Sequence, residues 1–265
     1  MLIFFSVFAG FTGSLLGLGG GVILIPALTL IYKVPIHQAI AISLVSIVAN
    51  SVTSTPIFIK SELTNIRIGL FLVLATITGA LGGVYLSEIT PPPFLFILFG
   101  FFLLFSAYLM ITQISTKRTA TGHPFSQLMG FDATTNTAKE LSYKVDQPFH
   151  ALFWMLISGL LASLLGIGGG VLKVLAMDYY MKLPLKVSSA TSNFMIGITA
   201  TAASASYLVQ GKINYEIVAP VVLGIVLGAF LGAKVLLKIS EQKVRKFFVL
   251  VLVFISIQMI RRGFA

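Results

Sequence analysis

The residues best placed to bind a ligand are two glycine clusters that interrupt apolar stretches of the chain. Glycine raises the free energy of a helix interior by about 1 kcal/mol relative to alanine, so each cluster predicts a break in a helix. A helix that begins after the break presents free backbone N–H groups and the positive end of its dipole, which together bind anions. In the competing interpretation the glycines only let helices pack closely. We therefore predict a small anionic substrate at Gly17, Gly19, Gly20, Gly21, Gly166, Gly168, Gly169 and Gly170.

A single lysine adds positive charge beside the second cluster. Lys173 lies three residues after Gly170 within an apolar stretch, where the first cluster has Leu24. A charged side chain at the centre of a membrane helix costs a few kcal/mol, so a functional role is the default interpretation, here as the partner of an anion. Two alternatives remain open, because the side chain could extend to the membrane surface or could pair with Asp178 on the same short helix.

The apolar stretch that follows each cluster carries hydroxyl and amide side chains. Ser43 and Asn50 follow the first cluster, and Ser192 and Asn193 follow the second. Such groups donate hydrogen bonds to the oxygens of an anion, although they also join packed membrane helices. Ser43 and Ser192 occupy matching positions. Asn193 is the best single polar candidate, and Asn50 is its rough counterpart, out of register.

The two clusters belong to a longer internal repeat. Gly17 is matched by Gly166, 149 residues later, and the same offset relates Pro35 to Pro184. A constant offset over a long span indicates a duplicated unit. We therefore predict a first membrane repeat at 1–114, a polar linker between the repeats at 115–147 and a second membrane repeat at 148–265.

The composition places the chain in a lipid bilayer. Its 265 residues are 57% hydrophobic and 10% charged, and the mean hydropathy is +1.00. Several apolar stretches reach the roughly 20 residues that cross a membrane as a helix. The net charge of +10 does not indicate nucleic acid, because the basic residues lie in short connections between apolar stretches. We predict an all-α, multi-pass integral membrane protein; a homo-oligomer is compatible with this sequence.

The distribution of basic residues predicts how the repeats are oriented. Basic residues gather at 60–67 and 115–147 in the first half, and at 182–186 and 234–246 in the second, which are non-equivalent connections. Because cytoplasmic connections are enriched in Lys and Arg, equivalent connections should face opposite sides. This requires inverted repeats, each with a glycine-broken re-entrant hairpin and three transmembrane helices. We predict full spans at 36–59, 65–87, 93–114, 185–210, 214–238 and 241–260, with both termini outside the cytoplasm.

The sequence offers little to an enzyme or to a resident cofactor. The chain has no cysteine, its three histidines form no metal-ligand spacing, and neither glycine cluster ends in the GK[ST] of a phosphate-binding loop. No set of Ser, His and Asp is spaced as a catalytic triad. We therefore expect no catalytic residues, no metal and no cofactor.

The glycine clusters, the polar stretches after them, Pro35, Pro184 and the segment from Gly79 to Gly83 together resemble the TauE/SafE sulfite exporter family. This resemblance covers nearly the whole chain except 115–147. It implies a protein of prokaryotic inner membranes that moves sulfite or organosulfonate anions, and it falls on the two glycine clusters, Ser192 and Asn193. Lys173 is proposed on physical grounds alone.

Taken together, the sequence predicts a secondary transporter or uniporter. It would move a small sulfur-containing anion, such as sulfite or sulfoacetate, across the cytoplasmic membrane by alternating access. Two alternatives remain: an anion channel, and a membrane scaffold or assembly subunit whose glycine faces only pack.

Overall fold

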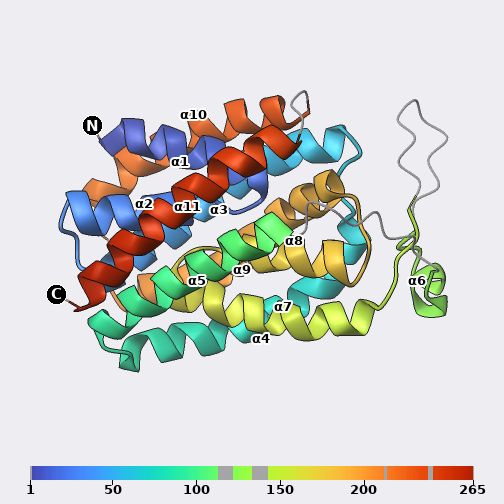
Figure 1. The fold of residues 1–265 in the computed structure, drawn as a ribbon, viewed down its shortest axis with the longest axis horizontal. Helices are drawn as coiled ribbons and strands as arrows, with labels where there is room; N and C mark the ends of the chain where they lie inside the picture. Colours follow the sequence, from blue (N-terminus) through green and yellow to red (C-terminus); the bar gives the residue numbers. More distant parts are fainter. Residues whose placement is uncertain (1, 113–121, 133–142, 212–213, 238–240, 265) are drawn as a thin grey trace.

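The computed structural model describes residues 2–112, 122–132, 143–211, 214–237 and 241–264, which form helices with no β-strand among them (Figure 1). The first half contains α1 (Leu2–Leu16), α2 (Gly21–Pro26), the π-helical turn η1 (Ala27–Ile31), α3 (Ile36–Lys60), α4 (Ile66–Ile89) and α5 (Pro92–Thr112). A short helix, α6 (Pro124–Leu128), lies in the linker. The second half contains α7 (Pro148–Leu165), α8 (Gly170–Tyr179), α9 (Leu185–Val209), α10 (Tyr215–Leu236) and α11 (Glu241–Phe264).

The helices follow the sequence prediction closely. Both glycine clusters break a helix, and the six predicted spans coincide with α3, α4, α5, α9, α10 and α11 to within a few residues. Within the described residues, α3, α4, α7 and α10 are long and apolar enough to cross a membrane. The sequence had predicted α7 only as one arm of a hairpin, too short to cross. Helix α7 has 18 residues and ends where the second glycine cluster begins. It is therefore about 27 Å long.

The matched residues of the two halves begin equivalent helices. Pro35 and Pro184 precede α3 and α9 with nearly identical backbone angles, φ −55° and ψ 140° against φ −55° and ψ 139°. Asn65 and Asn214 precede α4 and α10, and each side-chain oxygen accepts a hydrogen bond from a backbone N–H in the first helical turn. An Asn in this position satisfies one of the N–H groups that a helix start leaves without a partner. The 149-residue repeat is therefore visible in local structure.

Helices from the two halves interleave. Helix α1 packs along α10, and the equivalent helix α7 packs along α4, while α3 pairs with α9 and α5 pairs with α11. Helix α10 also packs on α3, and α4 on α9. Two bundles result. The first contains α1, α2, α3 and α10, and the second contains α7, α8, α9 and α4. The bundles meet where α3 contacts α9. Each bundle takes one helix from the other half of the sequence.

Glycines outside the clusters bring α4 close to α7 and α10 close to α1, two pairs whose helices run parallel. A Cβ atom added to Gly79 or Gly83 on α4 would lie 2.1 Å from the carbonyl oxygen of Leu156 or Leu160 on α7, respectively. The equivalent glycine of α10, Gly228, would place its Cβ 2.0 Å from the carbonyl oxygen of Val7 on α1. Small residues that let backbones approach are typical of packed membrane helices.

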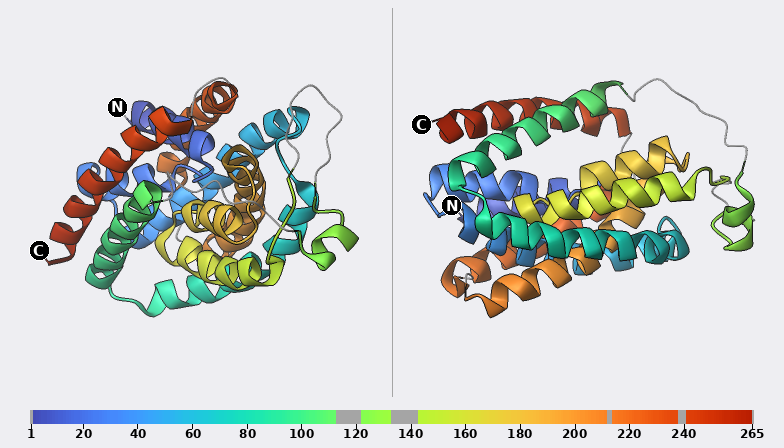
Figure 2. Two further views of the ribbon diagram at one scale, coloured as in Figure 1. Left: turned by 45° about the vertical axis from the view of Figure 1, so that its right-hand side comes forward. Right: turned by 90° about the horizontal axis from the view of Figure 1, so that it is seen from below.

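The connections gather at two opposite ends of the molecule. The described part of the linker, the loop between α3 and α4 and the loop between α8 and α9 lie at one end, which we call the linker end (Figures 1 and 2). The backbone N–H of Asp146 donates to the carbonyl of Met181 there. The two chain termini lie at the other end, which we call the terminal end.

The described part of the linker is docked on the bundle through Asn65. Its amide nitrogen donates to the carbonyl of Phe131 at 3.0 Å and to the hydroxyl of Tyr143 at 2.9 Å. Burial raises the pKa of Tyr143, so this phenol stays neutral well above physiological pH. The backbone N–H of Asn65 donates to Thr191 Oγ1 on α9. The linker is thus joined to a helix that reaches the centre of the protein.

Gly79→Ala should lower the melting temperature of the detergent-purified protein by several degrees, because its Cβ would displace the backbone of α7. Gly82→Ala on the same helix is the control: no atom lies within 4 Å of its added Cβ. That exchange should leave the melting temperature unchanged or raise it, since alanine favours a helix over glycine. Equal melting temperatures for the two variants would contradict the close packing of α4 on α7.

Candidate functional site

Two glycine loops meet back to back at the centre of the protein. The first glycine loop (residues 17–20) joins α1 to α2, and the second glycine loop (residues 166–169) joins α7 to α8. A Cβ atom added to Gly170 would lie 1.9 Å from the carbonyl oxygen of Gly17, and one added to Gly21 would lie 2.4 Å from that of Gly166. Backbone therefore touches backbone, and a larger residue at Gly21 or Gly170 would separate the loops. The positive φ angles that favour glycine occur at Gly17, Gly19, Gly20, Gly166, Gly168 and Gly169.

Each glycine loop is held by a serine from the other half of the chain. The hydroxyl of Ser43 on α3 donates to the carbonyl of Gly166 at 2.7 Å, and that of Ser192 on α9 donates to the carbonyl of Gly17 at 2.9 Å. A serine has one O–H hydrogen. In this conformation that hydrogen is used within the protein, which agrees with the packing alternative for Ser43 and Ser192.

The amide of Asn193 is occupied by contacts between helices. Its nitrogen donates to the carbonyls of Ser14 at 3.0 Å and Ser189 at 3.1 Å, and its oxygen faces the hydroxyl of Ser54 at 3.5 Å. The side chain thereby joins α1 to α9, and its hydrogen-bonding capacity is largely used there.

Asn50 differs from Asn193 in having an amide without partners. The residue is fully buried on α3, and among the described residues neither its Oδ1 nor its Nδ2 makes a hydrogen bond. Its equivalent at the 149-residue offset is Thr199. Leaving a buried polar group unpaired costs about 1–3 kcal/mol, so such groups are rare and call for an explanation.

Lys173 is buried beside the second glycine loop. Its side chain is 0% exposed, and Nζ donates to the carbonyl of Gly168 at 3.2 Å and to the hydroxyl of Thr199 at 3.2 Å. That hydroxyl is 2.8 Å from the hydroxyl of Thr76 on α4. The side chain therefore points toward the centre instead of the membrane surface, and neither of its partners is Asp178.

The surroundings of Lys173 are positive and lack a counter-charge. Both partners of its Nζ are neutral, and no carboxylate bonds it within the described residues. The N-terminus of α8 starts at the same loop, and the N-cap Gly169 provides no side-chain cap. The dipole of this ten-residue helix adds to the charge of the lysine. The arrangement can bind an anion that enters without its water, since an unneutralised buried cation is otherwise costly.

Two isoleucines cover the tips of the glycine loops. A Cβ added to Gly19 would lie 2.9 Å from Cγ2 of Ile47 on α3, and one added to Gly168 would lie 3.1 Å from Cγ2 of Ile196 on α9. These residues are equivalent at the 149-residue offset, and both are fully buried. Their apolar side chains close the loop tips in this conformation.

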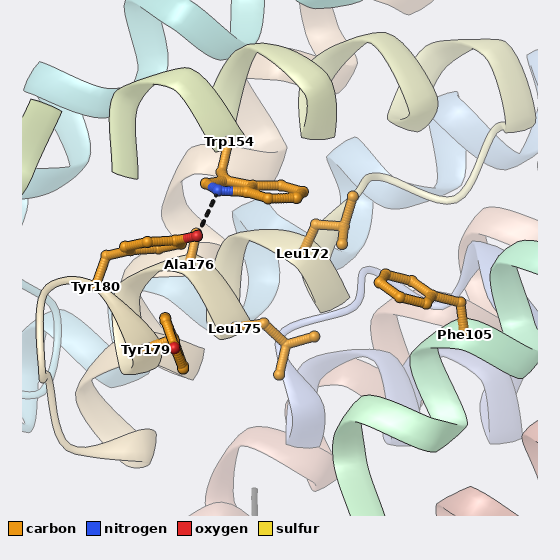
Figure 3. A pocket seen from close by; sticks show the side chains of 7 residues that line it. All are labelled: Phe105, Trp154, Leu172, Leu175, Ala176, Tyr179 and Tyr180. Atoms are coloured by element: carbon orange, nitrogen blue, oxygen red, sulfur yellow. Dashed lines mark hydrogen bonds between the residues drawn. The ribbon is translucent and has the colours of Figure 1, made fainter. Parts of the chain in front are cut away.

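A separate groove lies beside α8, against the residues that Figure 3 shows. It has a volume of about 220 Å³ and is lined by Phe105, Trp154, Leu172, Leu175, Ala176, Tyr179 and Tyr180. Its polar feature is a hydrogen bond of 2.8 Å from Trp154 Nε1 to Tyr180 Oη. Lys173 does not line this groove, and its Nζ bonds Thr199 on α9. The lining of this groove carries no charged side chain.

Apolar helices, two central glycine loops and a buried cation define a multi-pass membrane protein of the transporter class. The model of the family described as "Sulfite exporter TauE/SafE" matches residues 2–259. The chain belongs to this family, which confirms the resemblance noted in its sequence, and it is a membrane transporter.

Curated relatives carry names of the same class. The chain is 28% identical over 270 residues to "Probable membrane transporter protein YunE" of Bacillus subtilis, covering 99% of this chain and 97% of the relative. It is 24% identical to "Probable membrane transporter protein YdhB" of the same organism, covering 88% and 89%. It is 27% identical to "Probable membrane transporter protein MJ0441" of Methanocaldococcus jannaschii, covering 81% and 74%. No solved structure gives a significant match.

Sequence reasoning did not select all residues that surround Lys173 and the loops. Thr76 and the isoleucines Ile47 and Ile196 were not among its candidates. The isoleucines match at the repeat offset, which is a usable signal. Thr76 is equivalent to Ile225, so its polar contact with Thr199 breaks the repeat and could be found only in the folded protein.

Gly169→Ala should abolish transport and lower the melting temperature. Gly169 has φ 66°, and an added Cβ would lie 2.5 Å from the carbonyl oxygen of Ser158. Gly211→Ala is the control, because Gly211 has φ 68° with no atom within 4 Å of the added Cβ. It carries only the backbone strain of about 1–2 kcal/mol. Normal transport and stability in Gly169→Ala would show that the second glycine loop tolerates a side chain.

Proposed function

We propose that this transporter is a secondary transporter or uniporter for a small sulfur-containing anion, with Lys173 as the charged contact. The observation that carries the proposal is the buried Nζ of Lys173, whose bonds go only to neutral groups beside the N-terminus of α8. Burial of this charge is costly, and an anion would relieve that cost. Sulfite or an organosulfonate such as sulfoacetate would supply this negative charge and agrees with the family's name.

The inverted repeat is part of the same proposal. Helix α1 runs inward from the terminal end, whereas its equivalent α7 runs inward from the linker end (Figures 1 and 2). The basic connections with Lys60, Arg67, Lys144, Lys182 and Lys186 lie at the linker end. This distribution supports a cytoplasmic linker end and termini on the other side. The two glycine-tipped hairpins would then enter from opposite faces.

Alternating access would move the two bundles rather than the two sequence halves. The helices of each bundle pack on one another, and the two bundles meet at α3 of the first and α9 of the second. A shift at this interface would separate Ile47 from Ile196 and expose the loops to one side at a time. Transport through sites at broken membrane helices follows this scheme in other repeat-built carriers.

Lys173→Met tests the proposed anion contact at Lys173. Methionine keeps the length and apolar stem of lysine and removes the charge, so the fold should be retained. In proteoliposomes loaded with sulfite or sulfoacetate, the wild-type protein should show saturable counterflow that needs no proton or sodium gradient. Lys173→Met should weaken apparent affinity about 5- to 150-fold through loss of a charge-assisted contact of about 1–3 kcal/mol.

Lys60→Met is the matched control, because it removes the same charge from an exposed position at the end of α3. It should leave counterflow unchanged. Flux that is never accelerated by substrate on the opposite side would favour the anion channel. A folded wild-type protein that neither binds nor moves any anion would favour the scaffold. Equal affinity in Lys173→Met and wild type would remove Lys173 from the site.

A further inference from the structure

The unpaired amide of Asn50 marks a second polar position beside the glycine loops. Asn50 is 0% exposed, and neither Oδ1 nor Nδ2 has a hydrogen-bond partner among the described residues. It lies three residues after Ile47, whose side chain reaches both Gly19 and Gly168. Three residues rise about 4.5 Å along a helix, so Asn50 is within about one turn of the contact with the loops.

The internal repeat relates Asn50 to the Lys173 site. Asn50 is equivalent to Thr199, and Lys173 is equivalent to Leu24. In the second half the lysine and the threonine bond one another. In the first half the corresponding pair is a leucine and an amide. The two related positions therefore differ in chemistry, since one holds a cation and the other holds an uncharged donor and acceptor.

Because both Oδ1 and Nδ2 of Asn50 lack a partner among the described residues, only some ligand groups would form hydrogen bonds with both atoms. An anion would accept from Nδ2 and leave Oδ1 unpaired, and a cation would do the reverse. An uncharged hydroxyl or carboxamide group both donates and accepts, so it matches both atoms. Other polar side chains on this helix use their hydroxyls within the protein: Ser43, Ser46, Ser51 and Ser54 each have a partner.

We infer that Asn50 binds an uncharged polar group of the substrate, while Lys173 holds its anionic head. Among the proposed organosulfonates this favours a short anion with one negative charge at one end and a hydroxyl or carboxamide group a few atoms away, over sulfoacetate, whose second group is a charged carboxylate. This inference rests on the proposed function, because it takes Lys173 as the site of the head group. It adds that one neutral group determines the choice among anions of equal charge.

The test compares two ligands that differ in one hydroxyl. Ethanesulfonate and 2-hydroxyethanesulfonate have the same head and charge, and the affinity of the full-length protein for each is measured in detergent. Wild type should prefer 2-hydroxyethanesulfonate about 5- to 20-fold, as expected for one buried hydrogen-bonded group. Asn50→Leu should lose this preference and keep the affinity for ethanesulfonate. Its melting temperature without ligand should not fall, since the amide has no partner in the protein to lose.

The variants distinguish failure of this inference from failure of the proposed function. Lys173→Met should weaken both ligands by a similar factor and retain the preference for the hydroxyl. If Asn50→Leu does not fold, Asn50→Thr replaces it in the test, since threonine is the residue at the equivalent position 199. Asn50→Thr should reduce the preference for 2-hydroxyethanesulfonate. An unchanged preference in either folded Asn50 variant overturns the role of Asn50, as does equal weakening of both ligands. If wild type binds neither sulfonate, both the inference and the sulfonate proposal are overturned.

Discussion

The structure depends on a contact between two stretches of bare backbone. Gly170 lies against the carbonyl of Gly17, and Gly21 against that of Gly166, at distances that leave no room for a Cβ. Peptide groups at this depth need partners, because an apolar interior offers no water. Ser43 and Ser192 supply two of them from the opposite halves. This reciprocal arrangement explains why the serines, the loops and the helices that carry them recur at one offset.

The chemistry arises where the repeat is broken. The first half presents Leu24 and Asn50, whereas the second presents Lys173 and Thr199. A duplicated scaffold therefore carries one buried charge instead of two. In the proposed function, a single cation near the α8 N-terminus would attract an anion without the repulsion that two neighbouring lysines would create. The repeat builds the two glycine loops, and the departure at Lys173 places one charged side chain beside the second loop.

Much of the local structure is predictable from the sequence, because it depends on residues close together in the chain. Glycine breaks the helices, Pro35 and Asn65 begin them, and the apolar surroundings of Lys173 indicate its burial. The pairing of helices was less accessible. Ser43 and Gly166 are 123 positions apart, and nothing near either residue reveals the other.

The two asparagines show the same limit within the site. Asn193 was the preferred polar candidate, yet its amide joins α1 to α9. Asn50 was only its rough counterpart, yet its amide is the one without a partner. Both have similar neighbours in sequence, and the difference lies in what the other half of the chain offers. Similarly, the exchange of α4 and α10 between the bundles follows from packing rather than from chain order.

The most direct test of the central claim is to locate a bound anion in an experimental structure of the whole chain. Selenite, an analogue of sulfite, provides an anomalous scattering signal that identifies its position without reference to the protein. The account predicts one selenium peak within hydrogen-bond reach of Lys173 Nζ, beside the second glycine loop. A peak elsewhere with the Lys173 site unoccupied, or a carboxylate paired with that lysine, would contradict it.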